Sequence, residues 1–224
     1  MKKLFVSLII TAFILPAFSQ DKTDTAAKEP EKKSGEVEQI HQKVYTEIAL
    51  EDFESTQYTA TNLKFTKSKE QDGSIQIRDQ YAAEFNNSKK YLGVKVYGKR
   101  GDTFQVFPAK PLEIDKYCRS ISMWVYGKNF SGELTIILQD AEGTNHRISF
   151  GKINFLGWKK LTVNLDKKIK QQDQYLEQEK KLRILHIQYR PGNVTLHPEW
   201  QYFYLDDITA TVRDKYKDRQ SDDW

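Results

Sequence analysis

The sequence predicts an all-β protein, an antiparallel β-sandwich or jelly roll, and three observations lead to this prediction. Apolar residues recur at every second position in short runs between about residues 44 and 212. The runs are separated by Gly, Asn, Asp and Pro, which favour turns. No helical repeat alternates with them, so a parallel sheet with crossover helices is not expected. The spacing predicts roughly eight or more strands in one domain over residues 44–212.

Each predicted strand has one apolar face, and these faces form the expected core because successive side chains of a strand point to opposite sides. Residues 167–181 break this rhythm and predict either a short surface helix or a long loop. In chain order the apolar runs are Ile75 and Ile77; Leu92, Val94 and Val96; Ile121, Met123 and Val125; Leu134, Ile136 and Leu138; His146, Ile148 and Phe150; Leu161, Val163 and Leu165; Leu185, Ile187 and Tyr189; and Phe203, Leu205 and Ile208.

The two ends of the chain differ from this central part. Residues 1–19 combine two lysines, an apolar stretch from Leu4 to Leu15 and small residues before Gln20. This arrangement predicts a secretory signal peptide, whose apolar part is too short to span a bilayer. Residues 20–43 predict a flexible leader, and residues 213–224 predict a charged C-terminal tail. We therefore expect an exported protein that acts outside the cytoplasm.

The composition excludes several classes of protein. Charged residues make up 29% of the chain, and the mean hydropathy is −0.70, so a mostly membrane-embedded protein is excluded. The net charge is +4, from 35 basic and 31 acidic residues. This is too small to create the positive electrostatic potential that attracts nucleic-acid phosphates, so a nucleic-acid partner is not expected. The single cysteine, Cys118, excludes an internal disulfide framework, and we expect it to be buried. The four histidines are scattered and are expected to lie at the surface.

No catalytic motif was found, so we expect neither enzymatic activity nor a cofactor. Acidic pairs occur at Asp52 and Glu54, near the start of the domain, and at Asp206 and Asp207, in the last predicted strand. First and last strands often adjoin, so Asp52, Glu54 and Asp207 could hold a structural calcium ion. The same carboxylates could instead cleave a glycan by acid–base chemistry, or simply be solvated strand-end groups.

The second face of several strands carries the candidate interface. It exposes flat aromatic rings beside hydrogen-bonding groups, which can receive a sugar ring or the surface of another protein. Alternatively, loops cover some of these rings and make them a second core. The interface candidates are Tyr97, Trp124 and Tyr126 and, on a later strand, His186, Gln188 and Arg190.

Four stretches of the chain resemble the spirochaete flagellar filament outer layer (sheath) protein family, FlaA type. They are residues 120–134, 138–143, 146–161 and 204–208. The specific part runs from Trp-Val-Tyr-Gly at residues 124–127 to Gly-Trp-Lys at residues 157–159. The Asp-Asp-Ile ending at residues 206–208 is shared with many sugar-binding sandwiches, so we expect the sandwich to resemble carbohydrate-binding, galactose-binding-like modules. The chain looks like a short paralogue within this family.

The resemblance implies a non-enzymatic structural subunit in the periplasm. Such a subunit coats the flagellin core of a periplasmic flagellum and affects the stiffness, shape and motility of the filament. The implied partners are flagellin core proteins, other sheath subunits including a longer paralogue, and filament-coiling proteins, with no membrane after signal cleavage. The alternative function is a periplasmic carbohydrate-binding β-sandwich module, whose outer aromatic residues would stack on sugar rings.

Overall fold

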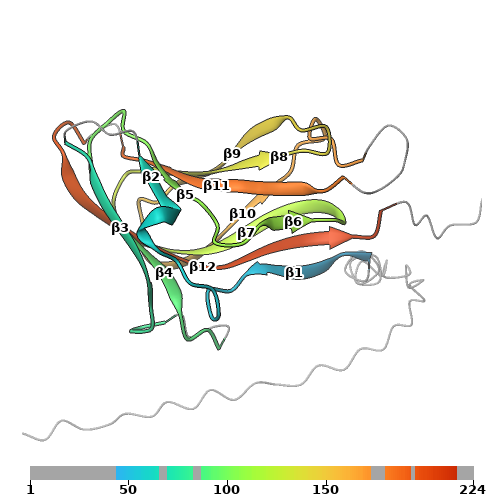
Figure 1. Cartoon of the computed structure of the whole chain (residues 1–224), viewed down its shortest axis with the longest axis horizontal. Helices are drawn as coiled ribbons and strands as arrows, with labels where there is room; N and C mark the ends of the chain where they lie inside the picture. The colour runs from blue at the N-terminus through green and yellow to red at the C-terminus, as the bar shows by residue number, and fades with distance from the viewer. Residues whose placement is uncertain (1–43, 66–69, 83–86, 173–179, 193–194, 216–224) are drawn as a thin grey trace, which may run out of the picture.

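A computed structural model describes residues 44–65, 70–82, 87–172, 180–192 and 195–215. This part of the chain forms two six-stranded sheets that stack face to face (Figure 1). All pairings between its strands are antiparallel. The predicted all-β sandwich is therefore confirmed. The predicted signal peptide and leader lie outside the described residues, and so does the tail beyond Lys215.

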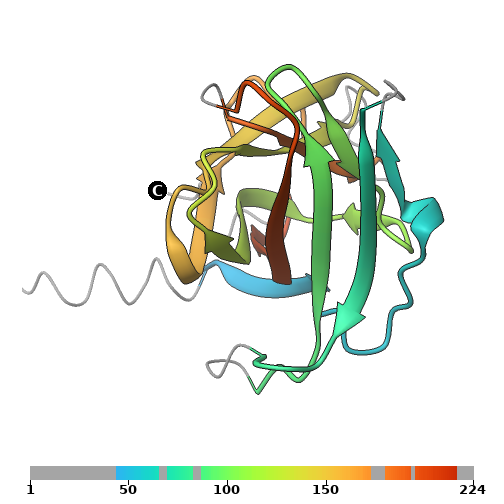
Figure 2. The same ribbon diagram turned by 90° about the vertical axis from the view of Figure 1, so that its left-hand side faces the viewer.

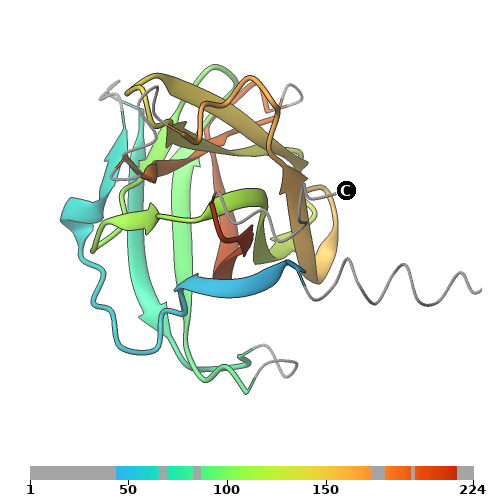
Figure 3. The ribbon, with the colours of Figure 1, turned by 90° about the vertical axis from the view of Figure 1, so that its right-hand side faces the viewer.

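The first sheet, here called sheet A, is organised around β12 (Glu199–Arg213). On one side β12 pairs with β7 (Tyr117–Lys128), and β10 (Leu156–Asn164) continues the sheet beyond β7. On the other side β4 (Tyr91–Gly98) pairs with the first half of β12, and β3 (Asp72–Arg78) lies beyond β4 (Figure 2). On the same side as β4, the second half of β12 pairs with β1 (Thr46–Glu51). The first and last strands therefore adjoin as expected (Figure 3).

The second sheet, here called sheet B, is organised around β11 (Leu182–Arg190). One edge of β11 pairs with β8 (Glu133–Gln139), which pairs in turn with β9 (Asn145–Lys152). The other edge pairs with two short strands, β6 (Leu112–Ile114) and β5 (Phe104–Val106). A 3-10 helix, η1 (Ala60–Asn62), leads into β2 (Leu63–Phe65), which pairs with β5.

The core lies between the two sheets and consists largely of the predicted alternating residues. Leu134, Ile136 and Leu138 of β8 are wholly buried against Ile121, Met123 and Val125 of β7 and their neighbours. Ile77, Phe150, Val163 and Leu165 are only partly buried. Ile77, Phe150 and Val163 belong to edge strands, where the opposite sheet covers less of each side chain, and Leu165 directly follows the edge strand β10.

Two β-bulges change the predicted alternation. In β11 the register shifts between Ile184 and His186, so Ile184 faces the core before the bulge and Ile187 after it. Leu185, predicted to be a core residue, is therefore only partly buried. In β12 the register shifts between Asp206 and Thr209, which explains the three-residue step from Leu205 to Ile208. An extra residue on one strand has this effect because the side-chain period of a strand is two.

The first strand begins at Thr46 and the last ends at Arg213. Arg213, assigned to the tail from the sequence, is the last residue of β12. The described ends of the 167–181 segment form turns and loops, while residues 173–179 lie outside the described part. The buried side chain of Gln171 holds this segment against the start of β7, because it accepts a 2.7 Å hydrogen bond from the Cys118 amide and donates a 2.8 Å bond to the Cys118 carbonyl. Within the described chain, no helix has the length and apolar character needed to cross a membrane.

Truncation of one wholly buried side chain tests the packing of the core. Replacing Ile136 by Ala leaves a cavity between the sheets and is expected to lower the free energy of unfolding by about 2 to 5 kcal/mol. Leu156 of the edge strand β10 is 78% exposed, so Leu156→Ala is the control and should change stability by less than about 0.5 kcal/mol. Urea unfolding followed by circular dichroism measures both. Equal losses for the two variants would contradict the described core.

Candidate functional site

The six predicted interface residues lie on two opposite faces of the sandwich. Tyr97, Trp124 and Tyr126 belong to β4 and β7 and point outward from sheet A, because they alternate with buried residues of those strands. His186, Gln188 and Arg190 belong to β11 of sheet B. The structure therefore divides the candidates between two faces, with three on each, and on sheet A it places Tyr97 opposite Trp200 and Trp124 opposite Asp206.

On sheet A, four rings pack together to form what is here called the aromatic cluster: Tyr91, Tyr126, Trp158 and Tyr204. Tyr126 is in register with Trp158 on β10 and with Tyr204 on β12. The ring centroids are 5.4 Å and 5.6 Å apart, and both pairs meet edge to face. Tyr91 completes the cluster with edge contacts to Trp158 and Tyr204. Edge-to-face pairs stabilise one another through the ring quadrupole, so the cluster holds a defined shape.

Tyr91 and Trp158 meet across the outer face of sheet A. Tyr91 belongs to β4 and Trp158 to β10, with β12 and β7 between them in the sheet. Their ring centroids are nevertheless 5.6 Å apart. Side chains that stood straight out from these strands would hold the rings further apart, since each strand adds about 4.8 Å. The Tyr91 and Trp158 side chains therefore lean toward each other over β12 and β7.

A second group of rings continues along the same face and is covered by cations. The Trp200 ring lies 5.1 Å from the Tyr97 ring, and the Lys95 ammonium lies 4.0 Å from the Trp200 centroid. The Lys128 ammonium lies within 5.7 Å of the rings of both Tyr202 and Tyr204. Such cation–π contacts contribute roughly 0.5 to 1 kcal/mol each at exposed sites. Aromatic rings and lysines thus alternate over this face.

The sequence prediction missed most residues of this face. Trp200, Tyr202 and Tyr204 alternate with the buried Phe203 and Leu205 on β12, so the period-two rule already places them outward. Trp158 lies within the Gly-Trp-Lys motif, but the sequence does not indicate that it meets Tyr126. That contact depends on the pairing of β7 with β10.

The sheet B group is less open than the sequence predicted. The His186 ring packs 4.9 Å from the Phe107 ring, and burial lowers the pKa of His186. Gln188 is only 5% exposed. With its amide turned so that the oxygen faces Arg190, the Gln188 oxygen accepts hydrogen bonds from Arg190 Nε at 2.8 Å and from Arg190 Nη2 at 3.2 Å. Of the three, Arg190 alone is exposed.

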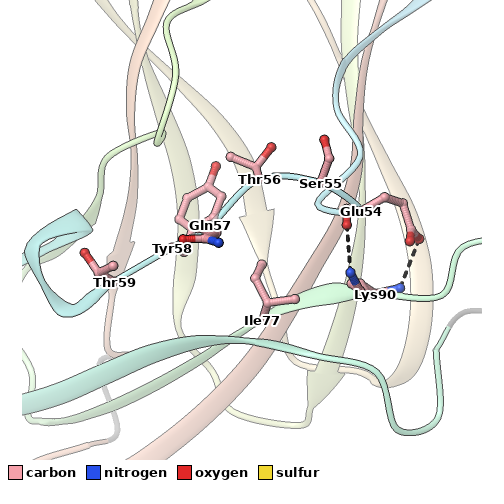
Figure 4. A pocket seen from close by; sticks show the side chains of 8 residues that line it. All are labelled: Glu54, Ser55, Thr56, Gln57, Tyr58, Thr59, Ile77 and Lys90. Carbon is pink, nitrogen blue, oxygen red and sulfur yellow. Dashed lines mark hydrogen bonds between the residues drawn. The ribbon is translucent and has the colours of Figure 1, made fainter.

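The acidic residues near the start of the domain hold two loops together. Glu54 Oε1 accepts hydrogen bonds from the backbone amides of Lys89 and Lys90, at 2.5 Å and 3.0 Å. Lys90 Nζ donates a 2.9 Å bond back to the Glu54 carbonyl oxygen, so the loop after β1 is fastened to the loop before β4 (Figure 4). Asp52 accepts from the Glu54 amide. These contacts border a hollow of about 410 Å³ that is also lined by residues 55–59 and Ile77.

The calcium hypothesis gains no support from this geometry. Asp207 lies in the bulge of β12 with a φ of 42°. Within the described ranges, no group of three or more His, Cys, Asp or Glu residues is arranged to hold a metal ion. A calcium site at Asp52, Glu54 and Asp207 therefore stays a prediction.

Asp206 is the unusual carboxyl of this region. It is wholly buried and in register with Trp124 of β7. The pKa of Asp206 is raised to about 7, mainly by burial; hydrogen bonds from the Ser88 side chain and the Asp207 amide oppose this rise, and the nearby charges of Asp207 and Glu54 add to it. Its Oδ1 accepts from the Asp207 amide, whereas Oδ2 has no hydrogen-bond partner among the described residues. An uncharged carboxylic acid suits this position better than a carboxylate.

This burial predicts that stability falls as the pH rises. The folded protein keeps a proton on Asp206 up to about pH 7, whereas the unfolded chain releases it near pH 3.9. The contribution of this proton to the free energy of unfolding is therefore fully present below about pH 4 and is lost as the pH rises toward 7. Between pH 5 and pH 8 the native protein should lose roughly 2 to 3 kcal/mol more unfolding free energy than Asp206→Asn does.

Urea unfolding of both proteins at the two pH values measures this difference. The substitution keeps the shape of the side chain and removes only its titration, so all other groups cancel in the comparison. Parallel pH dependences for the two proteins would show that Asp206 is ionised in the fold.

Comparison with known proteins adds three findings. Residues 64–220 match the family model described as flagellar filament outer layer protein Flaa. A protein of Brachyspira hyodysenteriae (strain ATCC 49526 / WA1), described as flagellar filament outer layer-like, is 29% identical over 149 residues, which span 65% of this chain and 68% of the relative.

Among solved structures, the chain is similar to two carbohydrate-binding modules at 12% identity. TmCBM61, solved in complex with beta-1,4-galactotriose, has a TM-score of 0.44 and the match covers 75% of this chain and 99% of the module. The family 11 module of cellulase Lic26A-Cel5E of Clostridium thermocellum has the same score and covers 77% and 98%. Similarity at this level carries no inference about a ligand.

Proposed function

The chain belongs to the flagellar filament outer layer protein family, whose model covers residues 64–220, and we propose that it is a structural subunit of the outer sheath of a periplasmic flagellar filament. In this role it coats the flagellin core and affects the stiffness, shape and motility of the filament. The observation that carries the proposal is that the sequence motifs of the family resemblance meet in the aromatic cluster.

Three motif segments contribute to this surface. Trp-Val-Tyr-Gly lies on β7, Gly-Trp-Lys on β10 and Tyr-Leu-Asp-Asp on β12. The strands are neighbours, and the register aligns Tyr126 with both Trp158 and Tyr204. Buried core positions would explain the Val and Leu of these motifs, but not the outward aromatic residues. A contact surface explains them.

The chemistry of the face suits contact with protein. Aromatic and basic side chains are enriched among the residues that dominate the binding energy of protein interfaces. The cluster rings are partly exposed, except for the buried Tyr91, so a neighbour can remove further apolar area from water. The lysines along its border can then set the register of the neighbour through complementary charge.

The carbohydrate-binding alternative has less support on this face. A sugar ring stacks on an open aromatic face. Here the Lys95 ammonium stands over Trp200, and Arg78 and Lys128 stand over Tyr204. The rings of the cluster also pack edge to face, which leaves no flat platform among them.

Charged side chains on the edge strand β10 are consistent with an assembly in which strands of neighbouring molecules do not pair at random. The edge strand β10 carries Lys159 and Lys160, and Lys160 forms a 2.7 Å ion pair with Glu47 of β1. Charged side chains on an edge strand discourage pairing with foreign strands. The proposed partners are the flagellin core, other sheath subunits including a longer paralogue, and filament-coiling proteins, and the proposed location is the periplasm.

Loss of the protein and damage to the cluster test the proposal. A strain without the gene should have thinner or misshapen filaments and altered swimming, as measured by electron microscopy and tracking. Replacing both Tyr126 and Trp158 by Ala should reduce incorporation into isolated filaments at least about tenfold, since truncating such an anchor costs about 2 kcal/mol or more.

Tyr81→Ala is the matched control because this ring is 94% exposed and lies outside the cluster. It should be incorporated like the native protein. Filaments of normal diameter in the deletion strain, or full incorporation of the double variant, would contradict the proposal.

A further inference from the structure

A hollow at one end of sheet B is bordered by three basic residues: Arg100, Lys152 and Arg190. They lie in the loop after β4, at the end of β9 and at the end of β11. Its volume is about 580 Å³, within the range of roughly 300 to 1,000 Å³ that is usual for ligand sites. None of the residues that line the hollow belongs to the aromatic cluster.

The three cations carry charge that the described part of the fold does not neutralise. None of them forms an ion pair with a carboxylate in that part of the chain. Glu133 also lines the hollow, but its two oxygens are used by Arg147, at 2.8 Å, and by Ser149, at 2.7 Å. The border therefore has an excess of positive charge.

The guanidinium of Arg190 is held in place without being neutralised. Its Nε and Nη2 donate to the side-chain oxygen of the buried Gln188 at 2.8 Å and 3.2 Å, so the edge of the guanidinium that carries Nη1 is the one that can receive a ligand. An uncharged amide orients the guanidinium and leaves donors for a ligand. The planar fork of arginine matches the two oxygens of a carboxylate, which gives bidentate binding.

The wall of the hollow adds a hydroxyl group without a partner. Ser131 Oγ is buried and has no hydrogen-bond partner among the described residues. It is buried because Gly192 presses against it, and a Cβ on Gly192 would lie 1.9 Å from this oxygen. Gly192 covers this oxygen, so the exposed cations at the border, and not this hydroxyl, are available to a ligand.

We infer that this hollow is a docking site for carboxylate side chains on an acidic segment of an adjoining filament protein. The hollow is open and bordered by exposed cations, which suits a side chain presented by a neighbouring surface. The inference rests on the proposed function for the identity of the partner. The recognition itself follows from the arginine and lysine side chains.

Binding of a synthetic octaglutamate peptide to the purified protein tests the inference without filaments. Isothermal titration and amide NMR shifts should show binding at the hollow that weakens with added NaCl, because exposed charges are screened. Changing Arg100, Lys152 and Arg190 together to Glu should reduce the affinity at least about tenfold. Octaglutamine should not bind.

The matched control changes the exposed Lys110, Lys167 and Lys168 to Glu, which alters the net charge equally. Its affinity should stay within about twofold of the native value. Thermal unfolding checks that both triple variants fold, and the single Arg190→Gln variant replaces the first if it does not. This single variant should still weaken binding severalfold.

Three results would overturn the inference: no peptide binding, equal loss in the control, or binding of inorganic phosphate that the peptide does not displace. Failure here leaves the proposed function standing if the deletion strain has thin filaments. Peptide binding at the hollow together with normal filaments in that strain would instead remove the proposed function and keep the site.

Discussion

The packing of β12 between its neighbours is the constraint on which the rest of the structure depends. Its inward-facing residues are each at most 1% exposed: Phe203, Leu205, Ile208, Ala210 and Val212. A slip of one residue would turn Tyr204 into the core and Phe203 into solvent, so burial specifies the register strongly. The same register determines which rings point outward. The stability of the core and the composition of the aromatic face are therefore set together.

The bulge in β12 shows how a local irregularity shapes a neighbouring region. β4 and β1 share one edge of β12, and their pairings stop on either side of Asp206 and Asp207. The extra residue fits at this junction and leaves Asp206 buried. The loops tied together by Glu54 come from the adjacent ends of the same two strands. Burying a carboxyl without a full set of partners lowers stability at neutral pH, which is a cost of this junction.

The sandwich presents chemically different surfaces in different directions. Sheet A offers partly exposed rings with interspersed lysines, while one end of sheet B offers cations without carboxylate partners in the described chain. A subunit within a filament layer must contact neighbours of more than one kind, and separate patches allow each contact to be made independently. The rings supply buried area and the charges supply orientation.

Residue alternation by itself determined the all-β class, most of the core and the outward position of Tyr97, Trp124 and Tyr126, because strand periodicity is a local property. The tertiary structure alone decided that His186 and Arg190 lie on the sheet opposite Tyr126. It also decided that Trp158 and Tyr204 meet Tyr126, and that a bulge moves Leu185 out of the core. Strand order and bulges arise from contacts between segments far apart in the chain, so no local pattern encodes them.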